Sequence, residues 1–255
     1  EEGELFAFGY GDNGQLGHGG EEDELVPRLV EALAGKKVIG ASSGMWHTAV
    51  WTEEGELSTF GYGYSGRLGH GGEEDELVPR LVEALAGKKV IGAAAGDCHT
   101  AAWTDEGELF TFGHGYSGML GHGGDEHEHV PRLVGTVAGK KVVGASAGRG
   151  RPDHTAAWTE EGELFTFGWG YFGQLGHGGG QTELVPRLVQ ALSGKKVVGA
   201  STGSLHTIVW TEEGQLFTFG FGDHGKLGHG GTHVQNEHVP RLVQALAGKK
   251  VVGAA

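Results

Sequence analysis

The feature that most constrains the fold of this chain is a repeat of about fifty residues that occurs five times. The dipeptide Phe-Gly recurs at spacings of 52, 52, 55 and 52 residues, beginning at Phe8, Phe60, Phe112, Phe167 and Phe219. Three extra residues within 148–154 account for the longer spacing, and two more lie between 229 and 240. A period of this length indicates that each repeat forms one supersecondary unit.

Each repeat is predicted to contain four short strands. Around the second Phe-Gly these are 36–41, 47–52, 56–61 and 77–82, which are rich in β-branched or aromatic residues and bounded by glycine. A tight turn is expected at 53–55, and half a helical turn at 31–34 that Gly35 ends. A proline recurs in the fourth strand, at Pro27, Pro79, Pro131, Pro186 and Pro240. Because proline cannot donate to a ladder, the fourth strand is expected at a sheet edge.

Four strands with one edge strand, in a period near fifty, predict an all-β chain: a β-propeller of four-stranded antiparallel blades. We predict a single propeller domain over 1–255, with repeat units at about 1–52, 53–104, 105–159, 160–211 and 212–255. Residues 1–5 align with 53–57 and residues 249–255 align with a first strand, so a second strand equivalent to 43–52 has no counterpart. We therefore expect the 255 residues not to close a ring by themselves, and further residues or a partner to fill the gap.

The composition argues against several classes of protein. Glycine supplies 52 of 255 residues without a three-residue period, which excludes collagen, and 38% hydrophobic residues argue against disorder. The net charge of −14 disfavours nucleic acid and favours a basic protein partner. The single cysteine, Cys98, permits no disulfide within the chain, which fits an intracellular reducing compartment. Apolar runs are too short for membrane insertion.

The repeat resembles that of the regulator of chromosome condensation family. The resemblance rests on F-G-x-G-x-x-G-x-L-G-H-G from Phe8, on Val26-Pro27, and on V-x-G-A-x-x-G-x-x-H-T from Val38, and it covers nearly the whole chain. It implies a propeller, usually with seven blades, of which these five repeats would be a part. The family includes a nucleotide exchange factor for a small GTPase, a plant ultraviolet photoreceptor, a bacterial inhibitor of β-lactamase and domains of ubiquitin ligases. Function must therefore be argued from the site.

The glycine and histidine motifs offer little support for a dinucleotide site or a metal site. The G-x-G-x-x-G that begins at Gly9 matches a dinucleotide fingerprint, but that site needs a helix after it, and Leu16-Gly17-His18-Gly19-Gly20 cannot start one. We therefore expect no cofactor. Most of the 15 histidines recur once per repeat, as His18 and His47 do, and are expected to bond the backbone of their own blade. Outside this framework, 125–129 and the pair His233 and His238 are weak metal signals beside the alternative of solvated loops, so no metal is expected.

Tryptophans occupy two kinds of position. One position recurs in four repeats, at Trp51, Trp103, Trp158 and Trp210, and is expected to be buried between blades. The photoreceptor's tryptophans resemble Trp46, but Cys98, Asp153 and Leu205 occupy the matching positions, so a light-sensing cluster is not expected. The sequence contains no catalytic triad or paired carboxylates that stand apart from the framework, and we predict no enzyme.

Differences between the repeats concentrate in two loops, one between the first and second strands and one after the third. In an up-and-down blade both loops emerge on one face, whereas the opposite loops, 53–55 and 34–37, barely vary. Aromatic residues and arginine anchor interfaces. The candidate partner-binding residues are Tyr10, Met45, Trp46, Tyr62, Tyr64, Arg67, Tyr116, Arg149, Arg151, Trp169, Tyr171, Phe172 and Phe221. The alternative is that the aromatic residues only cap the blade ends.

These observations favour a non-enzymatic protein–protein interaction platform, a subunit of a larger assembly. The alternative, which the family resemblance alone implies, is a guanine nucleotide exchange factor for a small GTPase. An exchange factor remodels the nucleotide site of its GTPase and needs no acid–base residue of its own.

Overall fold

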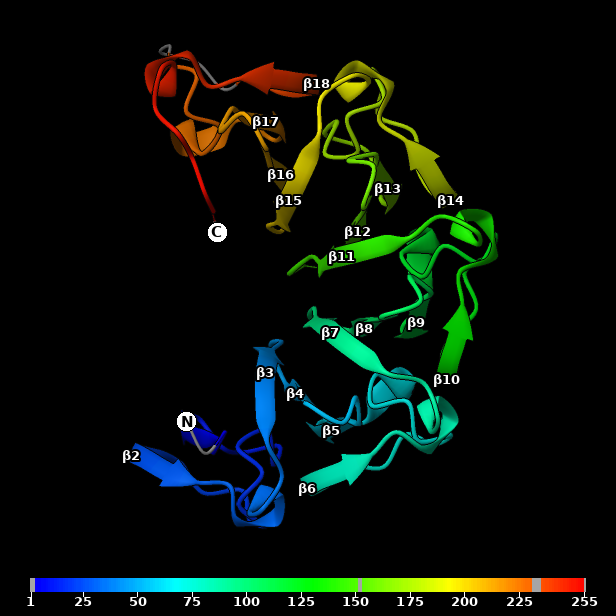
Figure 1. The fold of residues 1–255 in the computed structure, drawn as a ribbon, viewed down its shortest axis with the longest axis vertical. Coiled ribbons are helices and arrows are strands. Elements are labelled where there is room, and N and C mark those ends of the chain that lie inside the picture. The colour runs from blue at the N-terminus through cyan, green and yellow to red at the C-terminus, as the bar shows by residue number, and fades with distance from the viewer. Residues whose placement is uncertain (1–2, 151–152, 231–234, 255) are drawn as a thin grey trace. The chain divides into compact units, whose positions relative to one another are not determined.

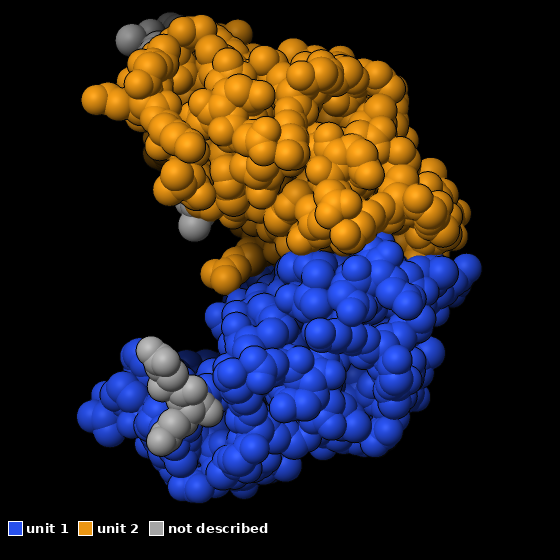
Figure 2. Space-filling model, viewed as in Figure 1, with its two compact units in different colours: residues 1–115, 126–133 blue, residues 116–125, 134–255 orange. Residues whose placement is uncertain are grey.

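The computed structural model describes residues 3–150, 153–230 and 235–254. Every element in these residues is a strand or a single 3-10 turn, and none is a helix long and apolar enough to cross a membrane. The chain divides into two compact units (Figure 2). Unit 1 comprises residues 1–115 and 126–133, and unit 2 comprises residues 116–125 and 134–255.

Four-stranded antiparallel blades make up most of each unit (Figure 1). Unit 1 holds two blades, whose strands are β3 (Val38–Ser43), β4 (His47–Thr52), β5 (Leu57–Gly61) and β6 (Glu76–Leu81), then β7 (Val90–Ala95), β8 (His99–Thr104), β9 (Leu109–Gly113) and β10 (Glu128–Leu133). Unit 2 holds two more, whose strands are β11 (Val142–Ala147), β12 (His154–Thr159), β13 (Leu164–Gly168) and β14 (Glu183–Leu188), then β15 (Val197–Thr202), β16 (His206–Thr211), β17 (Leu216–Gly220) and β18 (Glu237–Leu242). Consecutive strands pair in order, so each blade is an up-and-down sheet. The all-β, four-stranded blade prediction is confirmed.

The predicted strands agree with the observed ones to within two residues. The strand with the recurring proline is the outermost strand of every sheet, as expected from its missing N–H. The hairpin turn between β4 and β5 closes through Gly55 N–H, which donates to Thr52 O at 3.0 Å, and Gly55 has a φ of +85° that favours glycine. The expected half-turn is a 3-10 helix, η1 (Glu31–Leu33), and Gly35 at φ +81° follows it.

The first and last repeats depart from this pattern. The first has a two-stranded sheet of β1 (Phe6–Gly9) and β2 (Glu24–Leu29). Residues 249–254 were predicted as a first strand, but they carry no strand. In the complete blades a first strand takes its ladder bonds from the second strand, as Val38 does opposite Thr52, and these residues have no such neighbour in the described chain. Their backbone bonds are those of Lys249 N–H to Leu246 O at 2.9 Å and of Val251 N–H to Gly214 O at 3.1 Å, which the complete blades also have, as from Val90 N–H to Gly55 O.

The hydrophobic core lies between neighbouring blades within each unit. In unit 1 one cluster joins Ala49 and Leu57 to Val90, Ala102 and Phe112 of the next blade, with Trp51 packed against it. In unit 2 a matching cluster joins the blade of β11–β14 to the blade of β15–β18, with Trp158 against it. This confirms packing between blades for those two tryptophans.

The recurring tryptophans are only partly buried, which differs from the expectation of full burial. Each indole lies across a glycine of the first strand of its own blade, as Trp103 does opposite Gly92 in the pairing of β8 with β7. One face of the ring is thus covered by bare backbone. A side chain at Gly92 would overlap the ring, which explains why glycine occupies this strand position.

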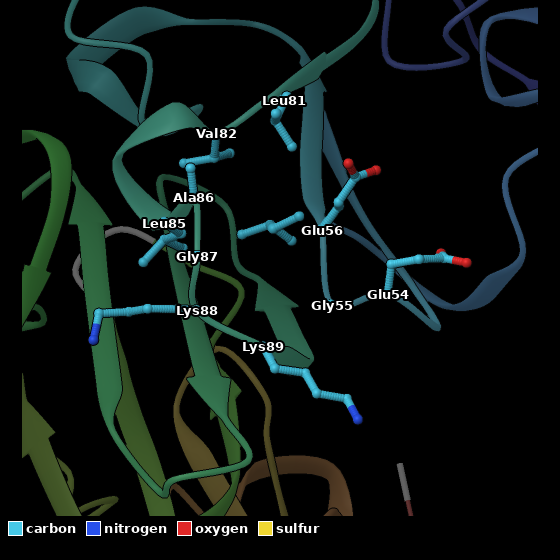
Figure 3. A pocket seen from close by; sticks show the side chains of 11 residues that line it. Glu54, Gly55, Glu56, Leu81, Val82, Leu85, Ala86, Gly87, Lys88 and Lys89 are labelled. Carbon is cyan, nitrogen blue, oxygen red and sulfur yellow. The ribbon is translucent and has the colours of Figure 1, made fainter.

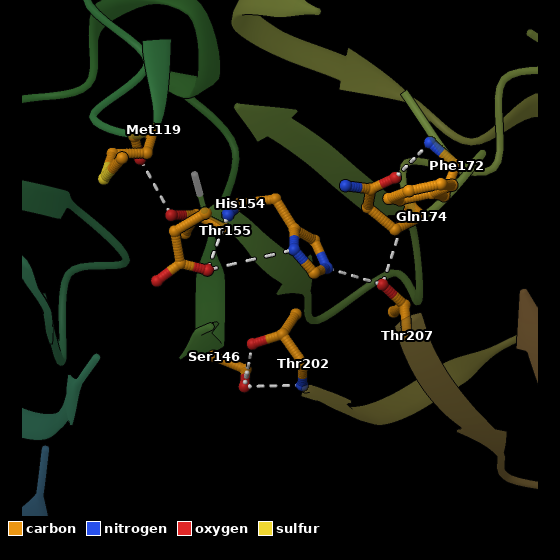
Figure 4. Close-up of polar contacts among 9 residues, drawn as sticks. Met119, Ser146, His154, Thr155, Phe172, Gln174, Thr202 and Thr207 are labelled. Carbon is orange, nitrogen blue, oxygen red and sulfur yellow. Dashed lines mark hydrogen bonds and ion pairs between the residues drawn. The ribbon is translucent and has the colours of Figure 1, made fainter. Parts of the chain in front are cut away.

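The His-Thr motif forms buried bonds that cross from blade to blade (Figure 4). In unit 2, His154 Nε2 lies 2.8 Å from Thr207 Oγ1 of the next blade, and Thr207 Oγ1 donates to Gln174 O at 2.7 Å. In unit 1, His47 Nε2 and Thr100 Oγ1 make the equivalent contact at 2.8 Å. Because the threonine proton goes to a carbonyl, the imidazole Nε2–H is the donor in each pair. We expected these histidines to bond their own blade, but they join two blades instead.

Replacing Thr207 by valine is expected to lower the free energy of unfolding by about 2 kcal/mol, because it removes the hydroxyl that joins His154 to the Gln174 carbonyl in a buried site. Urea titration monitored by circular dichroism measures the loss. Thr182→Val is the matched control, since Thr182 is exposed. Equal unfolding midpoints for Thr207→Val and the parent chain would contradict a stabilising role for this contact.

Candidate functional site

The two variable loops of each blade meet at one end of the sheet, which we call the variable end. The backbone of one loop bonds the other: Tyr62 N–H donates to Trp46 O at 2.8 Å and His114 N–H to Cys98 O at 3.0 Å. In unit 2, Trp169 N–H donates to Asp153 O at 2.9 Å and Phe221 N–H to Leu205 O at 2.8 Å. The sequence-based expectation that both loops emerge together therefore holds within every complete blade.

The predicted site residues fall into two classes of exposure. Five are open to solvent with 47–66% of their surface exposed: Tyr10, Met45, Tyr64, Tyr116 and Tyr171. Five more are half-buried: Trp46, Tyr62, Trp169, Phe172 and Phe221. In three of the four complete blades the ring directly after Phe-Gly is half-buried at the blade end, and the tyrosine two residues later is left in solvent. In the blade of β15–β18, Phe221 is half-buried and Asp223 takes the place of the tyrosine. The half-buried rings fit the capping alternative, and the exposed tyrosines are the ones for which the partner-binding prediction stands.

The arginines among the candidates have three different outcomes. Arg67 is fully buried, where Nε donates to Tyr64 O at 2.9 Å and Nη1 to Asp97 O at 2.7 Å. Its guanidinium carbon lies 4.9 Å from the Tyr62 ring centre. Arg67 therefore joins the two loops from the interior of the protein, and its charge is not exposed to a partner. Arg149 is exposed. Arg151 lies outside the described residues.

In unit 1 the candidate rings form two pairs, each of one exposed and one half-buried ring. Tyr10 and Trp46 meet edge to face, with ring centres 6.0 Å apart and planes at 63°. Tyr62 and Tyr64 stack at 6.0 Å with planes at 19°. Trp46 comes from the loop between β3 and β4, and Tyr10 follows β1. Adjacent repeats therefore build a shared aromatic surface, which we call the unit 1 patch.

Unit 2 carries a larger aromatic cluster, the unit 2 patch. Phe172 contacts the rings of Trp169 at 5.4 Å, Tyr171 at 5.1 Å and Phe221 at 4.6 Å between centres. The Phe221 ring also lies 4.8 Å below the ammonium group of Lys226. Such contacts contribute beyond buried area and hold the rings in fixed orientations. Lys226 differs between the repeats but is not among the candidate partner-binding residues predicted from the sequence.

The same loop holds strained backbone. Ser65, Ser117 and His224 have φ values of 61°, 57° and 55°, in the left-handed region that residues other than glycine seldom adopt. Strain of this kind costs about 1 kcal/mol or more and concentrates at functional sites. All three residues lie in the variable loop after the third strand, and no sequence signal marked them.

Two buried histidines beneath the variable end of unit 1 stay uncharged. Desolvation, followed by the charge of Arg67 and by the neighbouring His99, lowers the pKa of His47 to about 3. Desolvation, followed by the charges of His114 and Arg67, lowers the pKa of His99 to about 3 as well. The histidines of the Leu-Gly-His-Gly motif differ, because they bond their own repeat: His70 and His177 each lie 2.9 Å from a threonine hydroxyl, and His18 lies 3.2 Å from Ala7 O.

Among the residues that the structure describes, the weak metal signals do not assemble into a site. His127 Nδ1 accepts a bond from Gly115 N–H at 3.2 Å, and His129 Nε2 lies 3.2 Å from Glu73 Oε1. Within the described ranges no three histidine, cysteine or acidic side chains converge as metal ligands. His233 lies outside those ranges. The Gly-x-Gly-x-x-Gly segments close turns, such as the one bonded from Gly14 N–H to Gly11 O at 2.8 Å. In the described part of the chain no α-helix follows them to hold a pyrophosphate.

Shallow grooves lie at the opposite, uniform end of the blades. One of about 250 Å³ has Glu54 and Glu56 on its hairpin side and Lys88 and Lys89 on its connector side, over a floor that includes Leu85 (Figure 3). Two grooves in unit 2, of about 350 and 340 Å³, have corresponding linings. Because equivalent positions line the three grooves, the grooves follow from how the connector packs on the hairpin in these repeats.

Comparison with known proteins reveals close relatives by sequence. The chain is 42% identical over 252 residues to the E3 ubiquitin-protein ligase HERC2 of Mus musculus, which is 98% of this chain and 5% of HERC2. It is 37% identical over 242 residues to the ultraviolet-B receptor UVR8 of Arabidopsis thaliana, covering 94% of this chain and 54% of the receptor. The chain thus spans about one-twentieth of one relative and about half of the other.

Solved structures confirm the fold. Human WBSCR16 superposes with a TM-score of 0.82 at 24% identity, over 95% of this chain and 63% of that one. Prp20p of Saccharomyces cerevisiae, studied for its binding to Gsp1p and histones, superposes with a TM-score of 0.79 at 20% identity, over 94% of this chain and 59% of that one. At these identities the likeness establishes the propeller fold alone.

A family model supplies the assignment for the sequence as a whole. The model described as the regulator of chromosome condensation (RCC1) repeat matches residues 2–51, 54–103, 106–158, 161–210 and 213–255. These five matches leave only short gaps and coincide with the five repeats found from Phe-Gly. The chain therefore belongs to the regulator of chromosome condensation (RCC1) repeat family.

Proposed function

We propose that this chain is a non-enzymatic protein-binding platform that engages its partner through the variable ends of the blades. The observation that supports the proposal most directly is the set of exposed aromatic side chains at those ends. Tyr64, Tyr116 and Tyr171 occupy the same loop position in three repeats, and each is about half exposed or more. Tyrosine exposed on a rigid support is typical of interface anchors.

The support under these anchors is rigid. Backbone bonds between the two loops and half-buried rings hold each variable end of the complete blades, and the buried Arg67 side chain adds a support in unit 1. Preorganised loops bind at a lower entropic cost than mobile ones. The uniform end, by contrast, repeats its Glu-Lys ion pairs from blade to blade, such as Lys88 with Glu108 at 2.6 Å and Lys140 with Glu163 at 2.5 Å. A surface that is the same in every repeat offers little to distinguish one partner from another.

The test uses a partner recovered by affinity purification and then bound in purified form. Trp46→Ala with Tyr64→Ala tests the unit 1 patch, and Tyr116→Ala with Tyr171→Ala tests unit 2. At least one of these pairs is expected to weaken binding tenfold or more, since truncated anchors at hot spots cost about 2 kcal/mol each. Calorimetric titration measures the affinity, and a thermal melt checks that each variant folds.

The matched control is Glu54→Ala with Lys89→Ala at the uniform end, where binding is expected to stay within twofold. If both aromatic pairs leave the affinity within twofold and the control pair reduces it, the variable ends are not the binding surface. A nucleotide-release assay against a panel of small GTPases is run alongside. Accelerated nucleotide release from one of the GTPases would favour the exchange-factor function over the binding platform.

A further inference from the structure

Two aromatic rings at the variable end of the blade of β11–β14 lie nearly parallel. The ring centres of Trp169 and Tyr171 are 5.9 Å apart, and the ring planes meet at 15°. The Phe172 ring contacts both of them edge-on, at 85° and 83°. Tyr171 is 66% exposed and Trp169 is half-buried. Trp169 and Tyr171, which we call the ring pair, thus offer a partner aromatic surface in a fixed orientation.

The backbone around the ring pair is closely packed. Phe172 N–H donates to Gln174 Oε1 at 3.0 Å (Figure 4). A side chain at Gly180 would come within 2.7 Å of Tyr171 O, so loop 178–182 lies directly against the backbone of Tyr171. This blade and the next, of β15–β18, both have all four strands. The exposure of Tyr171 is therefore that of a complete blade with a complete neighbour.

Each ring of the pair also carries a polar group that can bind a partner. In the described part of the chain, neither the Trp169 indole N–H nor the Tyr171 hydroxyl has a hydrogen-bond partner. An indole N–H can only donate, and a donor that is covered without an acceptor costs free energy. A partner that covers the ring pair must therefore supply acceptors. A proline-rich backbone does so, because its carbonyl groups are free of internal bonds and proline has no N–H to satisfy.

The charges around the ring pair argue against a basic partner. Loop 178–182 has no charged side chain, whereas the equivalent loop 71–75 of the second repeat ends in three carboxylates. Residues 203–205 of the next blade are also uncharged. Loop 148–153 contains two arginines, and its one carboxylate, that of Asp153, is buried. These three loops thus expose no carboxylate that could pair with a lysine or arginine side chain, and a segment without positive charge fits them better.

We propose that the ring pair, with Phe172 at its edge, binds a proline-rich segment of a protein partner in the polyproline II conformation. The inference rests on the proposed binding platform and assigns the chemistry of one part of it. Proline rings of the partner pack on the aromatic rings, and the partner's carbonyl oxygens accept from the Trp169 N–H and the Tyr171 hydroxyl. Because a proline-rich segment is already extended, it loses little conformational entropy on binding.

The experiment uses the whole chain and an acetylated, amidated peptide of eight prolines. A glycine-serine peptide of the same length is also uncharged, but it lacks the proline rings and the preformed helix. The readout is the indole N–H resonance of Trp169, assigned by its loss in Trp169→Phe, with the Trp103 resonance as internal control. The proline peptide is expected to shift the Trp169 signal saturably and to leave the Trp103 signal unmoved.

Variants of the same blade test the two parts of the contact. Tyr171→Ala removes the ring and should weaken binding of the proline peptide at least fivefold. Tyr171→Phe removes only the hydroxyl and should weaken it about threefold, as the loss of one hydrogen bond does. Val185→Ala is the matched control, because Val185 is an exposed apolar side chain on β14, and its affinity should stay within twofold. A thermal melt checks that each variant folds.

The salt dependence tests the neutral character of the site. Raising the ionic strength tenfold should leave the affinity for the proline peptide within twofold, because salt screens only charged contacts. An acidic segment is tested with a peptide of eight glutamates, and a sugar with maltohexaose. Each is expected to leave the Trp169 signal unmoved, and a saturable shift by either one, with none by the proline peptide, would overturn the proposal in favour of that class of ligand.

Equal shifts with the glycine-serine peptide, or full binding to Tyr171→Ala, would overturn the proline site. The outcome is distinct from that of the proposed function. A natural partner that depends on the variable ends, together with no binding of the proline peptide at the ring pair, would leave the platform standing and remove this site.

Discussion

Lowering the pH from 7 to 5 is expected to reduce the free energy of unfolding by about 4 kcal/mol, through His47 and His99 together. Burial lowers the folded-state pKa of each histidine from 6.5 to about 3. Between these two pH values the histidines are therefore protonated in the unfolded chain and neutral in the folded chain. The stability is fully present above pH 6.5 and is lost as the pH falls toward 3. Each histidine contributes about 1.4 kcal/mol per pH unit inside that window.

Urea titrations between pH 6 and 5 avoid most carboxylates, which ionise below that range. Burial also lowers the pKa of His70, His177, His206 and His229, so these histidines add to the slope of the parent chain and a variant is needed to separate them. His47→Gln is the diagnostic variant. It can still donate to Thr100 but does not titrate, so the slope of unfolding free energy against pH should fall by about 1.4 kcal/mol per unit. A parent chain whose stability is the same at pH 6 and pH 5 would show that both histidines titrate normally, and hence that the contacts between blades admit water.

Replacing Gly92 by alanine is expected to lower the free energy of unfolding by about 2–3 kcal/mol, the usual cost of overpacking. Gly92 pairs with Trp103 across β7 and β8, and the added methyl group would overlap the indole at Cζ2 and Cε2. The glycine backbone has a φ that other residues also adopt, so the cost is steric and does not come from strain. Gly124→Ala, at a site with open space around it, is the matched control and should be neutral within about 0.5 kcal/mol.

The source of the cost is tested in a double-mutant cycle with Trp103→Ala. Because Trp103 is half-buried, its truncation should cost less than the 3–5 kcal/mol typical of a fully buried aromatic residue. In the Trp103→Ala background, Gly92→Ala should cost little or even stabilise, since alanine restricts the unfolded chain. An interaction energy near zero in the cycle would mean that the indole does not rest on Gly92 in solution.

The strands, the turns and the order of strands in each blade could be predicted from the sequence. These features are local: β-branched runs, glycine at turns and the edge proline act through their own backbone and immediate neighbours. Repetition strengthened the prediction, because four complete copies gave the same answer. The division between a uniform end and a variable end was also visible, since hairpin geometry alone puts the two variable loops together.

Only the tertiary structure decided which side chains of the variable ends face solvent. Arg67 looked like an anchor in the sequence, yet it is fully buried under Tyr62, because the carbonyls of two separate loops converge on its guanidinium. The sequence suggested that His47 bonds within its own blade, yet its Nε2 contacts Oγ1 of Thr100, which lies 53 residues away in the next blade. Both outcomes depend on how neighbouring blades pack against each other. That packing brings together residues that are far apart in the sequence, and no pattern in the sequence indicates which of them will be in contact. The same docking sets Trp46 against Tyr10. The sequence therefore predicted the blades, and the packing between them decided which of the candidate side chains are exposed.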